Sequence, residues 1–306
     1  MKGYKQSRLK GILFAIIGAS LWGLGGTVSD FLFKHAGINV DWYVTTRLII
    51  SGLFLLVMFK IMNSRQYIFV IFTRVSHVIT LIIYSLFGML IVQYAYMASI
   101  NEGNAAVATL LQYIAPVYII LWFAFRGKEK LRAFDIVVVL LTLIGTFLLL
   151  TNGSLSKLIV APSSLFWGIL VGLALAFYTI YAEKLLNKYA YILVVGWAMI
   201  IYGIIMTLRH PIWNVSMTQW HVSTFLYLIF GIIGGTALAY YLFIDNLKYL
   251  LAKETTLFGT IEPVVAVVAS GLFLDVSFKA FQILGIIIIV VLILVLSLKK
   301  QPNIDN

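Results

Sequence analysis

Tyr113-Ile114-Ala115-Pro116-Val117 and Thr260-Ile261-Glu262-Pro263-Val264 are two versions of one segment, 147 residues apart. Further residues match at this offset without a gap: Gly88 with Gly235, Tyr94 with Tyr241, Ala105 with Ala252, Thr109 with Thr256, and Ala133-Phe134 with Ala280-Phe281. Matches at one fixed offset indicate an internal duplication. Many secondary transporters are built from a duplicated, strongly apolar chain.

The composition places the chain in a membrane. Hydrophobic residues make up 62% of it and charged residues 11%, and its apolar runs are long enough to cross a hydrocarbon core of roughly 30 Å. Ten spans are predicted: 11–31, 41–61, 77–99, 104–125, 133–151, 165–185, 190–208, 222–246, 252–274 and 279–298. They must be helices, because lipid offers the backbone no hydrogen-bonding partner. We therefore expect an all-α integral membrane protein with ten transmembrane helices.

The net charge of +11 is a topology signal and does not indicate a nucleic-acid partner. With the N-terminus inside, 17 cations fall in inside segments: Lys2, Lys5, Arg8, Lys10, Lys60, Arg65, Arg74, Arg126, Lys128, Lys130, Arg132, Lys184, Lys188, Lys248, Lys253, Lys299 and Lys300. Only Lys34, Lys157, Arg209 and Lys279 fall outside. The positive-inside rule then predicts cytoplasmic termini in a cell-membrane protein. We expect the first run to remain as a helix, because it continues into Asp30 without a cleavage site.

The chain divides at its richest Gly/Ser/Asn/Pro stretch. This division predicts a first five-helix repeat over 1–152, a linker over 153–162, a second repeat over 163–299 and a cytoplasmic tail over 300–306. Because five is odd, the second repeat must enter the membrane inverted. The loop over 126–132 holds four cations, whereas its counterpart over 273–279 keeps one cation and gains Asp275, as expected for opposite faces.

Some chemistries are disfavoured by what the chain lacks. It has no cysteine and four histidines, none in a metal-ligand spacing, so we expect neither a metal site nor a cofactor. His77, His210 and His221 fall near span ends and His35 in a loop, where we expect solvated side chains. An integral-membrane enzyme would need ionisable residues converging at one face. Asp30, Asp245 and Glu254 stand isolated instead.

Five segments together resemble the drug/metabolite transporter superfamily, specifically its EamA-type members. They are Leu21-Trp22-Gly23, Arg47, Ala115-Pro116-Val117, Gly127-Lys128-Glu129-Lys130-Leu131 and Glu262-Pro263-Val264. The family typically has Gly-Glu after its fourth and ninth helices. Here the first copy is Gly-Lys-Glu, and the second position reads Leu274-Asp275-Val276. The resemblance covers nearly the whole chain and implies a transporter fold. The superfamily handles amino acids, sugars, nucleotide derivatives and drugs, so the substrate stays unnamed.

Glu262 is the most informative single residue. It lies about ten residues into its span, or roughly 15 Å deep at ~1.5 Å per residue. An ionised carboxylate at that depth must pair, face water or take up a proton. It could therefore bind a substrate amine or couple transport to a proton. Alternatively, it could be a hydrogen-bonded group that braces a kink at Pro263.

Arg47 is the cation within a span, roughly 9 Å below the outer end of the second helix at ~1.5 Å per residue. It could hold a substrate carboxylate in a bidentate fork. It could equally pair with Glu262 or with carbonyls of a broken helix, or extend to the outer interface.

Pro116 and Pro263 occupy equivalent positions, and each should free a carbonyl and kink its helix. Paired interruptions in the two halves are a pointer to a transporter's central site. Polar and aromatic residues near the kinks are the candidate cavity lining: Trp22, Gln93, Tyr94, Gln112, Tyr113, Tyr178, Tyr181, Trp197, Tyr240 and Tyr241. Trp42, Trp167, Trp213 and Trp220, near span ends, are expected to be interfacial anchors.

The sequence predicts a secondary transporter of a small metabolite such as an amino acid, working by alternating access, with a proton as a candidate coupling ion. Export follows from the resemblance alone. The partners expected are a small-molecule substrate and the lipid bilayer. Gly231-x-x-x-Gly235 gives weak support for a homodimer, because close packing within the chain also explains it. The rival interpretations are an integral-membrane enzyme and a non-transporting membrane sensor or assembly protein.

Overall fold

The structure is a computed structural model that describes residues 2–63, 65–127, 132–215 and 220–298. Its described residues are helical or in turns and loops, with no strand among them. Ten helical spans are long and apolar enough to cross a membrane, and all ten lie where the hydropathy predicts them. They are Arg8–His35, Val40–Met62, Val75–Glu102, Ala105–Phe125, Ala133–Thr151, Pro162–Leu186, Tyr191–Leu208, Val222–Lys248, Glu254–Phe273 and Ala280–Leu298.

Several spans are divided into shorter elements. The first half contains α1 (Lys2–His35), α2 (Val40–Met62), η1 (Val70–Thr73), α3 (Val75–Ile83), η2 (Tyr84–Leu90), α4 (Ile91–Glu102), α5 (Ala105–Gln112), α6 (Ala115–Phe125) and α7 (Ala133–Thr151). The second contains α8 (Pro162–Leu186), α9 (Tyr191–Arg209), α10 (Val222–Ile229), η3 (Phe230–Leu238), α11 (Ala239–Asp245), η4 (Asn246–Lys248), α12 (Ala252–Gly259), α13 (Ile261–Phe273) and α14 (Ala280–Leu298).

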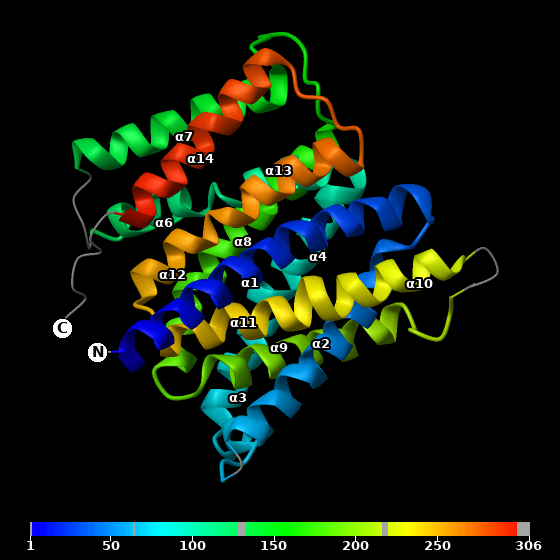
Figure 1. Cartoon of the computed structure of the whole chain (residues 1–306), viewed down its shortest axis with the longest axis vertical. Coiled ribbons are helices and arrows are strands. Elements are labelled where there is room, and N and C mark those ends of the chain that lie inside the picture. The colour runs from blue at the N-terminus through cyan, green and yellow to red at the C-terminus, as the bar shows by residue number, and fades with distance from the viewer. Residues whose placement is uncertain (1, 64, 128–131, 216–219, 299–306) are drawn as a thin grey trace.

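Helix α1 runs through the middle of the bundle, between the α12–α13 span and the span made of α10, η3 and α11 (Figure 1). Helices α7 and α14 pack side by side along one edge. Helix α2 packs along α9 toward the opposite edge. The start of α1 and the end of α14 lie at the same end of the bundle (Figure 1).

The contacts between helices come in matched pairs. Helix α1 packs on α13, as α8 packs on α5 and α6. Helix α1 also packs on η3 and α11, and its counterpart α8 packs in the same way on η2 and α4. Similarly, α2 contacts η3, and its counterpart α9 contacts η2. The remaining large contacts join counterpart spans: α2 with α9, α7 with α14, and the α5–α6 span with the α12–α13 span through α5 and α13.

Two helical irregularities also recur at the offset of 147 residues. The π-helical segments η2 and η3 begin at Tyr84 and Phe230, with Gly88 and Gly235 at equivalent positions inside them. The helix breaks between α5 and α6 and between α12 and α13 are likewise equivalent. The sequence marks the breaks through its two prolines, whereas no residue pattern marks the π-helical segments. Such segments are frequent at functional sites.

Glycines let three pairs of helices cross closely. A Cβ atom on Gly25 of α1 would lie 2.8 Å from the Cα atom of Gly235 in η3. Gly52 of α2 similarly faces the backbone of α9, and Gly145 of α7 that of α14. The glycines proposed for a homodimer are engaged within the chain, because Gly231 faces the Tyr43 hydroxyl and Gly235 faces α1. Close packing therefore accounts for them.

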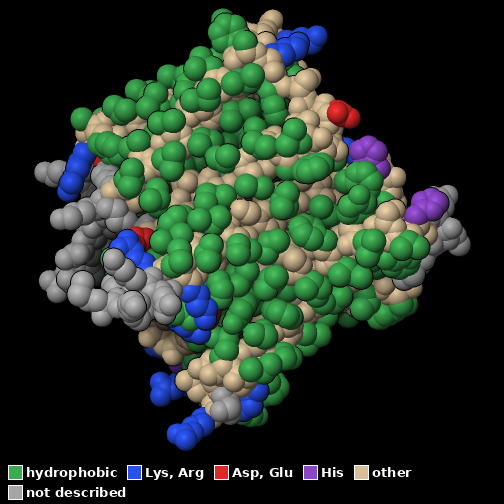
Figure 2. All heavy atoms as spheres, viewed as in Figure 1, with side chains coloured by type: hydrophobic (Ala, Val, Ile, Leu, Met, Phe, Trp, Pro, Cys, Tyr) green, Lys and Arg blue, Asp and Glu red, His purple; other side chains and the backbone are tan. Residues whose placement is uncertain are grey.

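Hydrophobic side chains cover the broad face of the bundle, and Lys and Arg side chains gather at its edges (Figure 2). Large exposed apolar residues recur along α7 and α14, including Leu140, Ile144, Ile287 and Val291. In water such a surface would aggregate, whereas in lipid it is the expected exterior.

Helices α7 and α8 are joined by a connection over residues 152–161. Helix α7 ends at Thr151, Asn152 takes a left-handed conformation with φ of 50°, and α8 begins at Pro162. Helix α7, which follows the connection from α6, begins at the end of the bundle opposite to the connection from α13 to α14 (Figure 1). Residues 128–131 of the former connection and the predicted tail over 300–306 lie outside the described residues.

Candidate functional site

The two helix breaks contact each other near the middle of their spans. Proline has no amide hydrogen to donate to the carbonyl four residues earlier, so Pro263 leaves the Gly259 carbonyl without its helical hydrogen bond. The Tyr113 hydroxyl, from the break between α5 and α6, lies 3.1 Å from that carbonyl oxygen. A side chain of one break therefore satisfies the backbone of the other.

Glu262 lies at this junction, at the start of α13. Its Oε1 accepts a hydrogen bond of 2.8 Å from the Gln112 amide, and its Oε2 lies 3.2 Å from the Tyr113 hydroxyl. The side chain is half-buried, and no lysine, arginine or histidine among the described residues forms an ion pair with it. A carboxyl group so placed can bind a cation or take up a proton. The bracing alternative also has support, because Tyr113 contacts both Glu262 and the kink carbonyl.

Arg47 lies within α2 and is buried, with 5% of its surface exposed. One terminal nitrogen donates to Gln93 Oε1 at 2.7 Å, and the guanidinium lies 5.5 Å from the Tyr43 ring centroid. Its Nε is buried and has no hydrogen-bond partner. No carboxylate in the described part of the chain pairs with it, so Arg47 neither extends to the interface nor forms an ion pair with Glu262.

The Arg47 cluster continues into the eighth span. Gln93 Nε2 donates to the Tyr240 hydroxyl at 2.9 Å. The Tyr240 ring meets Trp22 of α1 edge to face, with centroids 5.0 Å apart. Trp22 is followed on α1 by Gly23, whose Cβ position lies 2.6 Å from the Glu262 carbonyl oxygen. The two charged residues therefore belong to one central polar region.

Sequence reasoning missed Tyr202 of α9. Its side chain is fully buried, and its hydroxyl has no hydrogen-bond partner. A Cβ on neighbouring Gly203 would contact Ile49 of α2, which places Tyr202 within about one helical turn of Arg47 along the α2–α9 contact. The position of this tyrosine in the middle of a predicted span could have marked it as a candidate, because a tyrosine hydroxyl buried there usually needs a hydrogen-bond partner.

Several predicted lining residues have partners other than Arg47 and Glu262. Tyr94 packs edge to face on Trp167, and Tyr178 bonds to the Tyr191 hydroxyl at 2.7 Å. Tyr181 lies beneath the Lys184 ammonium group, toward the end of α8. Tyr241 borders a cavity described below.

Trp197 is another of these residues. Its indole donates to the Ile68 carbonyl at 2.8 Å and packs on Phe69 and Phe72. It holds the connection between α2 and α3 against α9, so it is not brought to Arg47 or Glu262.

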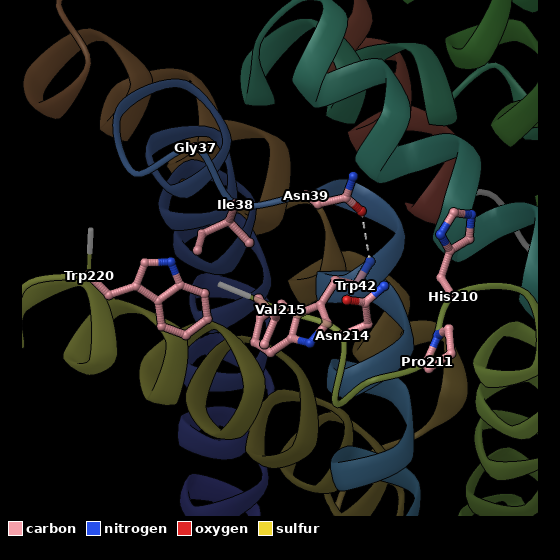
Figure 3. Close-up of a pocket in the computed structure, with 9 residues that line it drawn as sticks. All are labelled: Gly37, Ile38, Asn39, Trp42, His210, Pro211, Asn214, Val215 and Trp220. Atoms are coloured by element: carbon pink, nitrogen blue, oxygen red, sulfur yellow. Dashed lines mark hydrogen bonds between the residues drawn. The ribbon is translucent and has the colours of Figure 1, made fainter. Parts of the chain in front are cut away.

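Two cavities open at opposite ends of the α2–α9 pair. The larger, about 320 Å³, lies where α2 begins and α9 ends, and Figure 3 shows the residues that line it, among them Trp42, His210 and Trp220. The smaller, about 290 Å³, lies at the other end and is lined by residues such as Asn63, Tyr191 and Tyr241. Their volumes are at or just below the lower end of those of small-molecule sites.

Several residues that were expected to be interfacial contact residues that are distant in the sequence. The Trp42 indole donates to the Ile212 carbonyl at 2.7 Å. His77 was expected to be solvated, yet it is 9% exposed and bonds to the Tyr189 hydroxyl at 2.6 Å. His210 lies 3.1 Å from the Asp41 carboxylate. No three His, Asp or Glu side chains in the described ranges are arranged to hold a metal ion.

The isolated acids also have local partners. The fully buried Asp30 forms an ion pair of 2.7 Å with Lys34, and its other oxygen accepts the first amide of α5, that of Ala105. Glu254 pairs with Arg8 at 2.5 Å. Among the described residues, neither acid contacts another acid or a histidine. Each joins α1 to the start of another helix.

Comparison with known proteins gives one consistent result. The family model described as "EamA-like transporter family" matches residues 9–151 and again 162–298. A Salmonella typhimurium protein named uncharacterized inner membrane transporter YicL is 32% identical over 297 residues, covering 96% of this chain and 97% of that protein. The uncharacterized transporter YxxF of Bacillus subtilis is 29% identical, covering 62% and 61%. A solved crystal structure with 18% identity and a TM-score of 0.60 covers 96% of this chain and 97% of its own, which supports the fold.

Proposed function

The chain belongs to the EamA-like transporter family, and on that premise we propose that it exports small metabolites such as amino acids by alternating access. It is a multi-pass inner-membrane transporter of the drug/metabolite type. The substrate class, the direction, the coupling ion and the mechanism are the parts that we propose.

One observation carries the substrate class. Arg47 is a buried guanidinium with no carboxylate partner in the described residues and with one unpaired nitrogen. An unpaired charge inside a membrane protein is costly, and such residues mark substrate or ion pathways. A carboxylate of the substrate would complete the site through a bidentate, charge-assisted contact. The free hydroxyl of Tyr202 would lie near enough to act as a further donor.

Glu262, at the other end of the central polar region, supports a zwitterionic substrate. Glu262 offers a carboxyl group that can bind the substrate amine or carry a coupling proton. Trp22 and Tyr240 supply aromatic surface on the Arg47 side of the region. An α-amino acid presents one carboxylate, one amine and an apolar side chain, which matches these groups.

The mechanism that we propose is rocking of two inverted five-helix halves, over 1–152 and 163–299, about this region. It is supported by the matched helix contacts, the recurring irregularities and the two ranges of the family match. Cavities at both ends of the α2–α9 pair would serve as the two mouths. The distribution of 17 cations against 4 supports cytoplasmic termini and therefore the assignment of the Figure 3 cavity to the outer face.

The test is transport into proteoliposomes by the purified full-length chain. Radiolabelled amino acids, their decarboxylated amines, sugars and organic acids are each assayed with and without an imposed pH gradient. We expect saturable flux of an amino acid that its decarboxylated amine does not inhibit. Flux of sugars or amines with no amino-acid flux would contradict the substrate class, and equal flux with and without the gradient would contradict proton coupling.

A further inference from the structure

The Tyr113 hydroxyl lies between two acceptors and cannot donate to both fully. One acceptor is the Gly259 carbonyl oxygen at 3.1 Å, and the other is Glu262 Oε2 at 3.2 Å. A phenol carries one proton and can itself accept a hydrogen bond. The direction of the Tyr113 hydroxyl therefore depends on whether Glu262 carries a proton.

When Glu262 is ionised, the carboxylate is the stronger acceptor and takes the Tyr113 proton, because hydrogen bonds to ions are roughly twice as strong as neutral ones. The Gly259 carbonyl then loses its donor. Pro263 has already removed the amide that would have served this carbonyl within the helix. The break between α12 and α13 is left with a part-buried acceptor unsatisfied, which favours another backbone arrangement.

When Glu262 is protonated, every group in the cluster has a partner. The Glu262 hydroxyl donates to the Tyr113 oxygen, and Tyr113 donates to the Gly259 carbonyl. The Gln112 amide continues to donate to Oε1 at 2.8 Å. The proton comes from water and returns to it, and no covalent bond changes.

We propose that Tyr113 is the positioning residue that couples the proton on Glu262 to the helix break before Pro263. This inference rests on the proposed function, in which Glu262 takes up the coupling proton. The groups that face Glu262 are Gln112 and Tyr113 from the fourth span. No cation in the described ranges pairs with it, so no ion pair competes for the carboxylate.

The coupling has a route to the rest of the bundle. A Cβ atom at Gly23 of α1 would lie 2.6 Å from the Glu262 carbonyl oxygen and 3.0 Å from the Ala266 nitrogen. Backbone therefore meets backbone where α13 crosses the central helix. Any change at the break is transmitted to α1, because close-packed interfaces shift between discrete arrangements and do not deform continuously.

The duplicated position in the other half lacks this arrangement. Thr260 is the counterpart of Tyr113, and its hydroxyl bonds to the Leu257 carbonyl of its own helix at 2.7 Å. Ala115 is the counterpart of Glu262. The proton-dependent contact is thus built into one half only, which gives one coupling proton per chain.

The first experiment compares two modes of transport in proteoliposomes, gradient-driven accumulation and substrate exchange at equal pH. Tyr113→Phe removes the hydroxyl and keeps the ring. Tyr118→Phe is the matched control, since this neighbouring tyrosine of α6 packs against Gly172 outside the network. For Tyr113→Phe we expect the ratio of accumulation to exchange to fall about tenfold, equivalent to about 1.4 kcal/mol, whereas Tyr118→Phe keeps the wild-type ratio.

The second experiment measures hydrogen exchange at the break between α12 and α13, at a single pH. Glu262→Gln places an amide donor where the proton would be, so it should hold Tyr113 on the Gly259 carbonyl. Hydrogen exchange of the peptide over 255–262 should be slower in Glu262→Gln than in wild type by about threefold or more. Adding Tyr113→Phe should remove the difference. If Tyr113→Phe does not insert into the membrane, the comparison of Glu262→Gln with wild type still tests the inference.

The outcomes separate the inference from the function on which it rests. An unchanged ratio in Tyr113→Phe, with accumulation lost in Glu262→Gln, overturns the role of Tyr113 and leaves proton coupling intact. Accumulation retained in Glu262→Gln overturns proton coupling, and the inference with it. Equal exchange protection in Glu262→Gln and wild type overturns the inference, whatever the transport result.

Discussion

Arg47→Met should remove recognition of a substrate carboxylate without unfolding the protein. The methionine side chain has a similar reach and no charge. A hydrogen bond to a charged group contributes about 1.5–3 kcal/mol, so affinity for a carboxylate substrate should fall about 10- to 140-fold. The affinity for an amide analogue that lacks the anion should fall less, because only one of the two groups in its contact with Arg47 is charged.

The stability of the variant follows from opposing contributions. Removing the guanidinium loses its hydrogen bond to Gln93, about 1.5–3 kcal/mol, and its contact with the Tyr43 ring, about 1 kcal/mol. It also relieves the burial of a cation without an anion, which costs several kcal/mol. These contributions roughly cancel, so the melting temperature in detergent should stay close to that of wild type.

The assay is substrate exchange in proteoliposomes with an amino acid and its amide, at several concentrations of each. Arg74→Met, which removes an exposed cation from the connection before α3, is the control for a change in net charge. Arg47→Lys should give an intermediate loss, because lysine keeps the charge but not the planar fork. A parallel fall for the amino acid and its amide would refute the reasoning, as would undiminished affinity for the amino acid.

Three further perturbations test the packing and the ends of the bundle. Gly25→Leu should lower the melting temperature, with a cost of about 1–3 kcal/mol or more, because its Cβ would lie 2.8 Å from the Gly235 Cα. Unchanged melting would show that the two helices do not cross there. Asp30→Asn should destabilise by about 1–3 kcal/mol by removing the buried charge that pairs with the lysine one turn later; a melting curve equal to wild type would contradict this. His210 lies 3.1 Å from the Asp41 carboxylate and joins the end of α9 to the start of α2, so His210→Ala should lower the free energy of unfolding by up to about 1 kcal/mol. A melting curve equal to that of wild type would exclude a stabilising contact there.

The ten spans could be predicted because lipid imposes a simple requirement. A helix such as Ala280–Leu298 must be apolar for its whole length, and that property is visible residue by residue. The prolines likewise predict interruptions at 116 and 263, and the breaks lie three residues or fewer before them. What satisfies the freed carbonyl could not be predicted, because Tyr113 comes from another span.

The lining of the site was harder to predict for a physical reason. A membrane helix is apolar on all faces, so the sequence gives little indication of which face turns inward. Trp22 and Trp197 are both mid-span tryptophans, yet one meets Tyr240 and the other holds a loop through Ile68. The burial of His77 could not be predicted either, because its partner Tyr189 lies 112 residues away in the sequence.

The charged residues break the two-fold pattern of the sequence in a way that bears on mechanism. At the offset of 147 residues, Arg47 is replaced by Val194 and Glu262 by Ala115. Ala115 follows Tyr113, a partner of Glu262, by two residues, so the duplicated position carries no second carboxyl group. A symmetric scaffold with one acid and one base can instead hold a substrate in a single orientation. In the mechanism that we propose, the duplication supplies the two-sided motion, and the asymmetric residues determine what is carried and which half responds to a proton.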